Sequence, residues 1–214
     1  MKIIHMPKTV KSLIFDLDMT LYRNSAYYKA QTYLLIDALA RKFNWTFKEA
    51  LEKVDLFQMN YSKENNGQTQ SLGRIFESFG ISIKENAQWR DQLFSPEIYL
   101  ANDKKLKDIL LQLKSRFTLS LLSNNTLLVV KKTTKALGID GIFDHTIGLD
   151  STYEPKPHIA PFKLAADQLK QPFSHIISIG DRLSVDIDLP VQAGMGGILI
   201  ESMEDVYSLP EILK

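Results

Sequence analysis

From about residue 95 onward, short apolar runs alternate along the chain with segments whose apolar residues recur at helical spacing. Apolar strands that alternate with helices of about 10–15 residues are typical of βαβ units and a parallel sheet. Right-handed crossovers between such strands place helices on both faces of the sheet. We therefore predict an α/β fold, with strands at 117–122, 145–148, 176–179 and 197–200 and helices at 103–115, 126–137, 159–169 and 185–193.

One further apolar run, residues 13–15, predicts a buried strand that a long helical region separates from the others. From about residue 24 to 89, apolar residues follow the spacing of amphipathic helices, and no strand pattern interrupts them. Within this region Thr46 and Glu49 match a capping box, which marks a helix start. The polar run 62–70 predicts a loop. We expect a helical insert at 23–94 in a sheet domain formed by 1–22 and 95–214.

The composition narrows the classes of function. The formal net charge of +1 gives no electrostatic case for binding nucleic acid or an acidic membrane surface. The chain has no cysteine, which excludes disulfides, thiolate nucleophiles, zinc thiolate sites and iron–sulfur clusters. The first residues lack the apolar core of a signal peptide, and no apolar run is long enough for a membrane span. We expect a soluble cytoplasmic protein with no nucleic-acid or membrane partner, and its oligomeric state stays open.

Two carboxylates, Asp16 and Asp18, directly follow the first predicted strand, and the hydroxyl of Thr20 comes next. Ligands of open α/β sheets bind at the carboxyl ends of the strands. Two carboxylates so close repel unless a cation or a shared proton relieves them, and Mg²⁺ prefers such hard oxygen ligands. Asp16 could therefore act as a nucleophile and metal ligand, with Asp18 as acid and base. The alternative is a solvated pair of aspartates in a turn.

Two further strands end in residues that suit the same chemistry. Ser123 and Asn124 follow the strand at 117–122 and open a helix, where backbone N–H groups favour a phosphate. They could equally be an ordinary helix cap. Asp181 and Asp186 follow the strand at 176–179, directly after Gly180, and could complete a Mg²⁺ site with Asp16. A Gly-Asp turn with a capped helix is the alternative.

Lys156 lies between two prolines, whose fixed φ angles stiffen the segment. A fixed ammonium there could offset the charge of a phosphoryl group and of a carboxylate nucleophile. A solvated lysine in a loop is the alternative. Tyr22, Tyr27 and Tyr28 could contact a leaving group, or they could pack the core of the helical insert.

Taken together, the order of these motifs resembles the haloacid dehalogenase-like (HAD) superfamily, whose marks are D-x-D-x-T, a strand-end Ser or Thr, a Lys and G-D-x-x-x-x-D. The resemblance covers about residues 13–200. It implies a Rossmann-like core with a helical cap inserted after the first motif, a cap that closes over the site and selects the substrate. It also implies a Mg²⁺ ion held by the Asp16 side chain, the Asp18 backbone carbonyl and Asp181, with Asp186 helping to position it.

The same resemblance implies that Ser123 and Lys156 bind the phosphoryl group and that Asn124 assists. Thr20 joins these phosphate-binding residues and matches the phosphatase-type pattern. Members that resemble true dehalogenases lack a carboxylate at the position of Asp18. We therefore expect a Mg²⁺-dependent phosphatase that acts on a small phosphorylated metabolite through an aspartyl-phosphate. A phosphomutase of the β-phosphoglucomutase type and a non-catalytic phosphate-binding or regulatory module stay as alternatives. A receiver domain is disfavoured, because the helical insert and a nucleophile on the first strand do not fit one.

Overall fold

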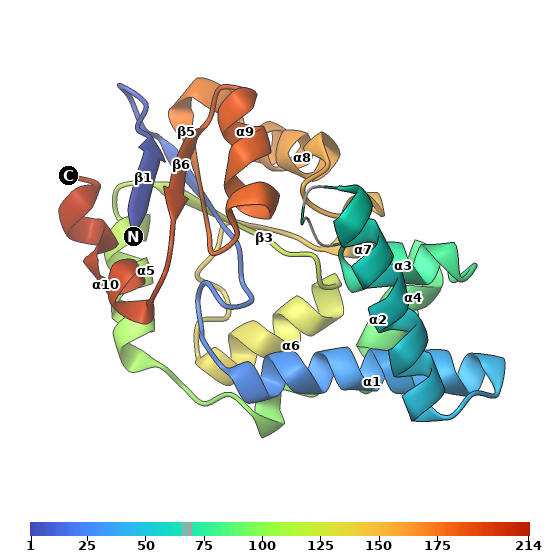
Figure 1. The fold of residues 1–214 in the computed structure, drawn as a ribbon. Coiled ribbons are helices and arrows are strands. Elements are labelled where there is room, and N and C mark those ends of the chain that lie inside the picture. The colour runs from blue at the N-terminus through green and yellow to red at the C-terminus, as the bar shows by residue number, and fades with distance from the viewer. Residues whose placement is uncertain (66, 68–69) are drawn as a thin grey trace. The chain divides into compact units, whose positions relative to one another are not determined.

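The structure is a computed structural model that describes residues 1–65, 67 and 70–214. The chain divides into two compact units, the first formed by residues 1–24 and 95–214 and the second by residues 25–94 (Figure 1). The second unit is therefore inserted into the first after β2 (Ser12–Phe15) and before the remaining parallel strands.

In the described part of the first unit, six strands form one sheet in the order β1-β6-β5-β2-β3-β4. Their bounds are β1 Lys2–His5, β2 Ser12–Phe15, β3 Thr118–Leu122, β4 His145–Ile147, β5 Ile176–Gly180 and β6 Gly196–Leu199. The pairs β2–β3, β2–β5, β3–β4 and β5–β6 are parallel, which confirms the predicted parallel sheet. β1 pairs antiparallel with β6 and was not predicted. Its side chains are all exposed, so burial leaves no pattern in its sequence.

Helices flank this sheet (Figure 1). On one side lie α8 (Ile159–Leu169) and α9 (Asp188–Gln192), and on the other lie α5 (Lys104–Lys114) and α10 (Met203–Ile212). The predicted helix at 185–193 is instead two elements, a π-helical turn (η3) and the short helix α9. The helical elements of the unit are η1 Pro96–Ile98, α5 Lys104–Lys114, α6 Leu127–Leu137, α7 Leu149–Thr152, α8 Ile159–Leu169, η2 Phe173–His175, η3 Leu183–Ile187, α9 Asp188–Gln192 and α10 Met203–Ile212.

The core of the first unit includes a cluster between the sheet and α8. Ile14, Leu122 and Ile147 come from three neighbouring parallel strands and pack with Phe162 of α8. All four side chains are at most 1% exposed. Side chains alternate along a strand, so Leu13 and Phe15, the neighbours of Ile14 in β2, point to the opposite face of the sheet. Both are also buried. The sheet is thus buried on both faces, as parallel sheets usually are.

The described part of the second unit contains helices and no strand. The helices are α1 Ser25–Phe43, α2 Phe47–Glu64, α3 Leu72–Ser78 and α4 Ile83–Leu93. The predicted capping box is confirmed, since the Thr46 hydroxyl accepts from the Glu49 N–H at 3.2 Å and the Glu49 carboxylate accepts from the Thr46 N–H at 2.7 Å. Ile36 and Ala40 of α1 pack on Ala50 of α2.

The loop predicted at 62–70 is wrong at its start. Helix α2 continues to Glu64, and the side-chain amide of Asn65 then donates to the carbonyl of Tyr61 at 2.8 Å. Positions 66, 68 and 69 of that prediction lie outside the described residues. None of the described helices is long and apolar enough to cross a membrane.

Phe162 provides a test of this packing. We expect Phe162→Ala to lower the free energy of unfolding by about 3–5 kcal/mol, because it removes a fully buried ring and leaves a cavity. Urea unfolding followed by circular dichroism measures the change. Leu128→Ala is the control, since Leu128 is 46% exposed on α6 of the same unit and should change stability by no more than about 0.5 kcal/mol. Equal losses in both variants would contradict the assigned core.

Candidate functional site

The predicted site residues lie at the carboxyl ends of three neighbouring strands. Asp16 directly follows β2, Ser123 follows β3 and Asp181 follows β5. β2 pairs in parallel with both β3 and β5, so these three strand ends meet at one edge of the sheet. Lys156 reaches the same edge from the segment between α7 and α8, and Asp186 reaches it from η3.

Lys156 is buried between two carboxylates. Its ammonium nitrogen lies 2.6 Å from Asp16 Oδ1, 2.7 Å from Asp186 Oδ1 and 2.9 Å from the carbonyl oxygen of Leu122. A lysine ammonium has three N–H donors, so all of them have acceptors. Burial alone would lower the pKa of Lys156, but the charges of Asp16 and Asp186 outweigh it and raise the pKa, which keeps the group cationic. Lys156 is therefore not a solvated loop lysine.

Asp16, Asp181 and Asp186 form a cluster of carboxylates. One oxygen of each lies within 4.8 Å of the others. Burial, together with the negative charges of Asp16 and Asp186, raises the pKa of Asp181 to about 6. When all three carboxylates are ionised, the Lys156 ammonium leaves an excess of two negative charges. Hard oxygen donors with this excess charge fit a divalent cation such as Mg²⁺. The Asp18 side chain is not part of the cluster.

Gly180 lets Asp186 approach the end of β5. A Cβ atom at position 180 would lie 2.3 Å from the Cβ of Asp186 and 2.6 Å from its carboxyl carbon. Asp186 is 1% exposed, and its Oδ2 accepts from the backbone N–H of Arg182 at 3.1 Å. Burial raises the pKa of Asp186, while the Lys156 ammonium opposes this effect. Asp186 thus orients Lys156 and borders the carboxylate cluster at the same time.

Thr20 and Asn124 contact other site residues rather than open space. The buried Thr20 hydroxyl donates to Asp16 Oδ2 at 2.9 Å and lies 3.5 Å from Asp181 Oδ1. The Asn124 amide binds the Lys156 backbone at both ends, accepting from its N–H at 2.7 Å and donating to its carbonyl at 3.1 Å. In this structure Thr20 orients the nucleophile candidate, and Asn124 holds the segment that carries Lys156. Their direct contact with a phosphate stays a prediction.

Asp18 lies beside Ser123, whose hydroxyl is 3.3 Å from Asp18 Oδ2. Two further side chains bind the same carboxylate, Tyr22 at 2.5 Å on Oδ1 and Asn125 at 3.0 Å on Oδ2. Asn125 is not among the residues predicted for the site, although it is two residues after Ser123 in the same turn. Tyr22 is predicted only as a leaving-group contact or a packing residue, although a spacing of four residues from Asp18 permits a local contact.

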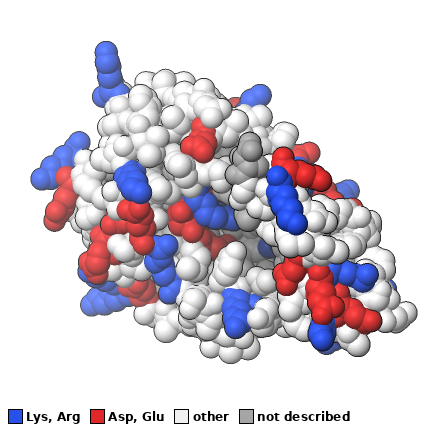
Figure 2. All heavy atoms as spheres, in the orientation of Figure 1, with Lys and Arg blue, Asp and Glu red and all other residues white. Residues whose placement is uncertain are grey.

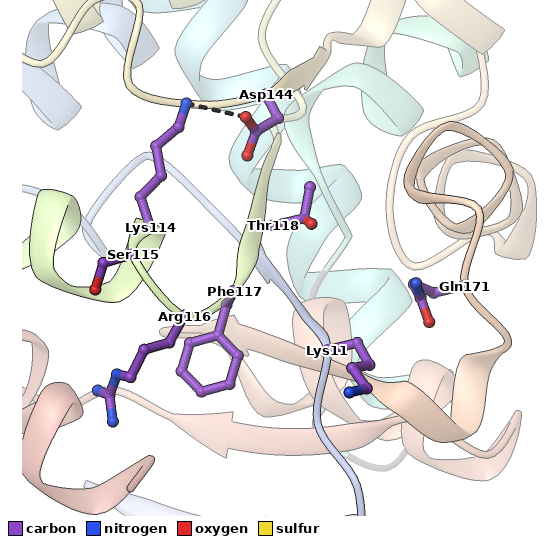
Figure 3. Close-up of a pocket in the computed structure, with 8 residues that line it drawn as sticks. All are labelled: Lys11, Lys114, Ser115, Arg116, Phe117, Thr118, Asp144 and Gln171. Atoms are coloured by element: carbon purple, nitrogen blue, oxygen red, sulfur yellow. Dashed lines mark ion pairs between the residues drawn. The ribbon is translucent and has the colours of Figure 1, made fainter.

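The opposite, amino-terminal end of the sheet carries a surface hollow of about 390 Å³ (Figure 3). Among the described residues that line it, Asp144 is the one carboxylate, and it pairs with Lys114 at 2.9 Å. Burial would raise the pKa of Asp144, but hydrogen bonds from the Leu119 N–H and from Lys114 lower it. Acidic and basic side chains are interspersed on the face that Figure 2 shows. The three clustered carboxylates and the buried Lys156 ammonium lie at the other, carboxyl end of the strands.

Residues 10–194 match a family model described as haloacid dehalogenase-like hydrolase. A stretch of 73 residues is 36% identical to a curated phosphoglycolate phosphatase of Colwellia psychrerythraea (strain 34H / ATCC BAA-681). This stretch is 34% of the chain and 32% of that relative, so the match spans about a third of the relative's length.

Solved structures share the fold across nearly the whole chain. A HAD phosphatase from Thermococcus onnurineus superposes with a TM-score of 0.63 at 18% identity, over 95% of this chain and 98% of that one. A 2-haloacid dehalogenase from Pseudomonas syringae pv. Tomato DC3000 superposes with a TM-score of 0.58 at 23% identity, over 96% and 98%. These likenesses confirm the Rossmann-like α/β fold, and they include proteins named for different reactions.

Gly180→Ala tests the close approach of Asp186. The added methyl group must displace the Asp186 side chain, so we expect weaker binding of a divalent cation and less stabilisation by it. Thermal unfolding with and without Mg²⁺ measures this stabilisation. Gly73→Ala is the control, because the nearest atom to its added Cβ is 4.0 Å away. An unchanged response to Mg²⁺ in Gly180→Ala would show that the position of Asp186 is unimportant for the cluster.

Asp181→Asn tests the crowding of the carboxylates. Its surroundings raise the pKa of Asp181 from the ordinary value of 3.8 to about 6 in the folded protein. The free energy of unfolding therefore decreases as the pH rises from about 3.8 to 6, and the full cost of the charge remains above pH 6. In the presence of EDTA, we expect the variant to melt a few degrees above the parent at pH 8 and to lose this advantage progressively as the pH falls from 6 to below 3.8. Asp167→Asn, at an exposed position on α8, is the matched control and should show no such pH dependence. A variant that melts below the parent at pH 8 would contradict the crowding.

Proposed function

Because the chain belongs to the haloacid dehalogenase-like hydrolases, we propose that it hydrolyses a small phosphomonoester through an aspartyl-phosphate on Asp16. One observation carries the proposal. The Asp18 carboxylate, two residues after Asp16, lies beside Ser123 at the strand edge that also gathers the carboxylate cluster and Lys156. Hydrolysis of a phosphate ester needs an acid for the leaving alcohol, whereas cleavage of a carbon–halogen bond does not. The name of the Colwellia relative, a phosphoglycolate phosphatase, supports the same class of substrate.

The first chemical step transfers the phosphoryl group to the protein. A carboxylate oxygen of Asp16 attacks phosphorus in line with the leaving oxygen. The bond between phosphorus and the leaving oxygen breaks, and Asp18 gives its proton to that oxygen. The products of this step are the free alcohol, the aspartyl-phosphate on Asp16 and the ionised Asp18.

The second step releases the phosphate. The Asp18 carboxylate takes a proton from water, and the water oxygen attacks phosphorus. The bond between phosphorus and Asp16 breaks, which gives inorganic phosphate and restores the Asp16 carboxylate and the protonated Asp18. Asp18 thus acts as acid and then as base.

Charge on the phosphoryl oxygens is offset by groups around Asp16. The Lys156 ammonium contacts Asp16 Oδ1. The Ser123 hydroxyl lies beside Asp18, from where it would donate a hydrogen bond to the phosphoryl group that Asp16 attacks. A Mg²⁺ ion held by Asp16 and Asp181, with Asp186 orienting the site and the Asp18 carbonyl as a further ligand, would supply additional positive charge. We propose further that the helical unit at 25–94, inserted after the first motif, acts as the cap that selects the substrate.

Asp16→Asn is the direct test of the nucleophile. An amide cannot attack phosphorus as a carboxylate does, so release of inorganic phosphate from p-nitrophenyl phosphate should fall below detection. EDTA should abolish the activity of the parent, and added Mg²⁺ should restore it. Asp167→Asn is again the control and should retain parental activity. Full activity in Asp16→Asn, or undiminished activity in EDTA, would overturn the mechanism.

The same assays separate the alternatives. A phosphomutase of the β-phosphoglucomutase type would return the phosphoryl group to a sugar phosphate and form an isomer in place of inorganic phosphate. A dehalogenase would release chloride from a chlorinated carboxylic acid. A binding module would bind phosphate and turn over neither substrate.

A further inference from the structure

The Asp18 carboxylate is held from two sides by neutral donors of the same structural unit. The hydroxyl of Tyr22 donates to Oδ1 at 2.5 Å, and the side-chain amide of Asn125 donates to Oδ2 at 3.0 Å. Tyr22 lies in the segment that follows β2, and Asn125 lies in the turn between β3 and α6. Two donors from different segments, one on each oxygen, define both the position and the rotation of a carboxylate.

Both donors are themselves fixed. Tyr22 is 6% exposed and Asn125 is 3% exposed. The backbone N–H of Asn125 donates to Ser123 Oγ at 3.0 Å, and its carbonyl accepts from the N–H of Leu149 at 2.9 Å. Buried polar side chains in such a network cannot turn away without leaving a partner unsatisfied, which costs about 1–3 kcal/mol. Tyr22 and Asn125 can therefore impose their geometry on Asp18.

The third donor differs from these two. Ser123 Oγ lies 3.3 Å from Asp18 Oδ2, a longer contact, and a hydroxyl can rotate its hydrogen toward another acceptor. When Ser123 turns to a phosphoryl oxygen, the bonds from Tyr22 and Asn125 to Asp18 remain. The hold on Asp18 is thus separate from the contact with phosphate.

We propose that Tyr22 and Asn125 are positioning residues that fix the Asp18 carboxyl group for proton transfer to the leaving oxygen. This inference rests on the proposed function, since it assigns a role within that reaction. Both residues act through Asp18. A proton moves efficiently only over a short, aligned hydrogen bond, so loss of the hold lowers the rate most for leaving groups that depend on protonation.

The test compares two substrates that differ in their leaving group. Phenyl phosphate releases a basic phenolate that needs a proton, whereas p-nitrophenyl phosphate releases a far weaker base that leaves without one. The readout is the ratio of kcat/KM for the two substrates, which reports the first phosphoryl transfer. A general loss of folded protein, cation affinity or phosphate affinity scales both values together and leaves the ratio unchanged.

For Tyr22→Phe we expect kcat/KM with phenyl phosphate to fall at least about tenfold more than with p-nitrophenyl phosphate, a modest part of the roughly 10²–10⁴-fold that a general acid contributes. Asn125→Ala should change the ratio in the same direction. In an Asp18→Asn background, Tyr22→Phe should change the ratio no further, because the group that it positions is gone.

Tyr207→Phe is the matched control. The Tyr207 hydroxyl donates to Asp103 Oδ2 at 2.7 Å, which is the same kind of bond in the same unit, far along the chain from the strand-end residues. This variant should keep the parental ratio. An unchanged ratio in both Tyr22→Phe and Asn125→Ala, in a parent that does hydrolyse both substrates, would overturn the positioning role alone. A parent that hydrolyses neither substrate, or an Asp16→Asn variant that hydrolyses both, would overturn the proposed function itself.

Discussion

The arrangement of the site depends on the two buried ion pairs that the Lys156 ammonium forms with Asp16 and Asp186. Buried charges are costly unless they are paired and hydrogen-bonded, and removal of one partner leaves the others uncompensated. This ammonium joins the end of β2, the π-helical turn after β5 and the carbonyl of Leu122 on β3. Asn124 then secures the Lys156 backbone, so one cation and one amide connect four segments that are distant in sequence.

The two carboxylates of the first motif differ in their surroundings, although only one residue separates them. Asp16 is 4% exposed, and contacts with the Lys156 ammonium and the Thr20 hydroxyl orient its carboxylate. Asp18 is half-buried and accepts from neutral donors. A nucleophile must stay ionised, whereas an acid and base must exchange protons. Pairs of carboxylates take such separate roles when their environments differ in this way.

Much of the fold and of the candidate site could be predicted, because the strand-end residues follow buried apolar runs and parallel strands end at one edge. Asp16 and Asp181 meet for this reason, whereas Lys156 reaches the same edge from the segment between α7 and α8 and Asp186 reaches it from η3. The exposed strand β1 could not be predicted, since burial does not shape its sequence. Nor could the bonds from Tyr22 and Asn125 to Asp18, or from Asn124 to the Lys156 backbone. The bonds of Asn125 and Asn124 depend on how separate segments pack, which no spacing in the sequence records. The spacing of four residues between Asp18 and Tyr22 permits their contact but does not require it.

The excess negative charge at the carboxylate cluster has a consequence for the order of events at the site. A phosphomonoester is itself anionic at neutral pH, so it would be repelled by three ionised carboxylates that a single ammonium balances only in part. A divalent cation cancels this excess of two negative charges and so removes the repulsion. In the proposed reaction, the cluster therefore favours an order of binding in which the cation comes first and the phosphate second, so that the departing phosphate would leave the ion in place for the next turnover.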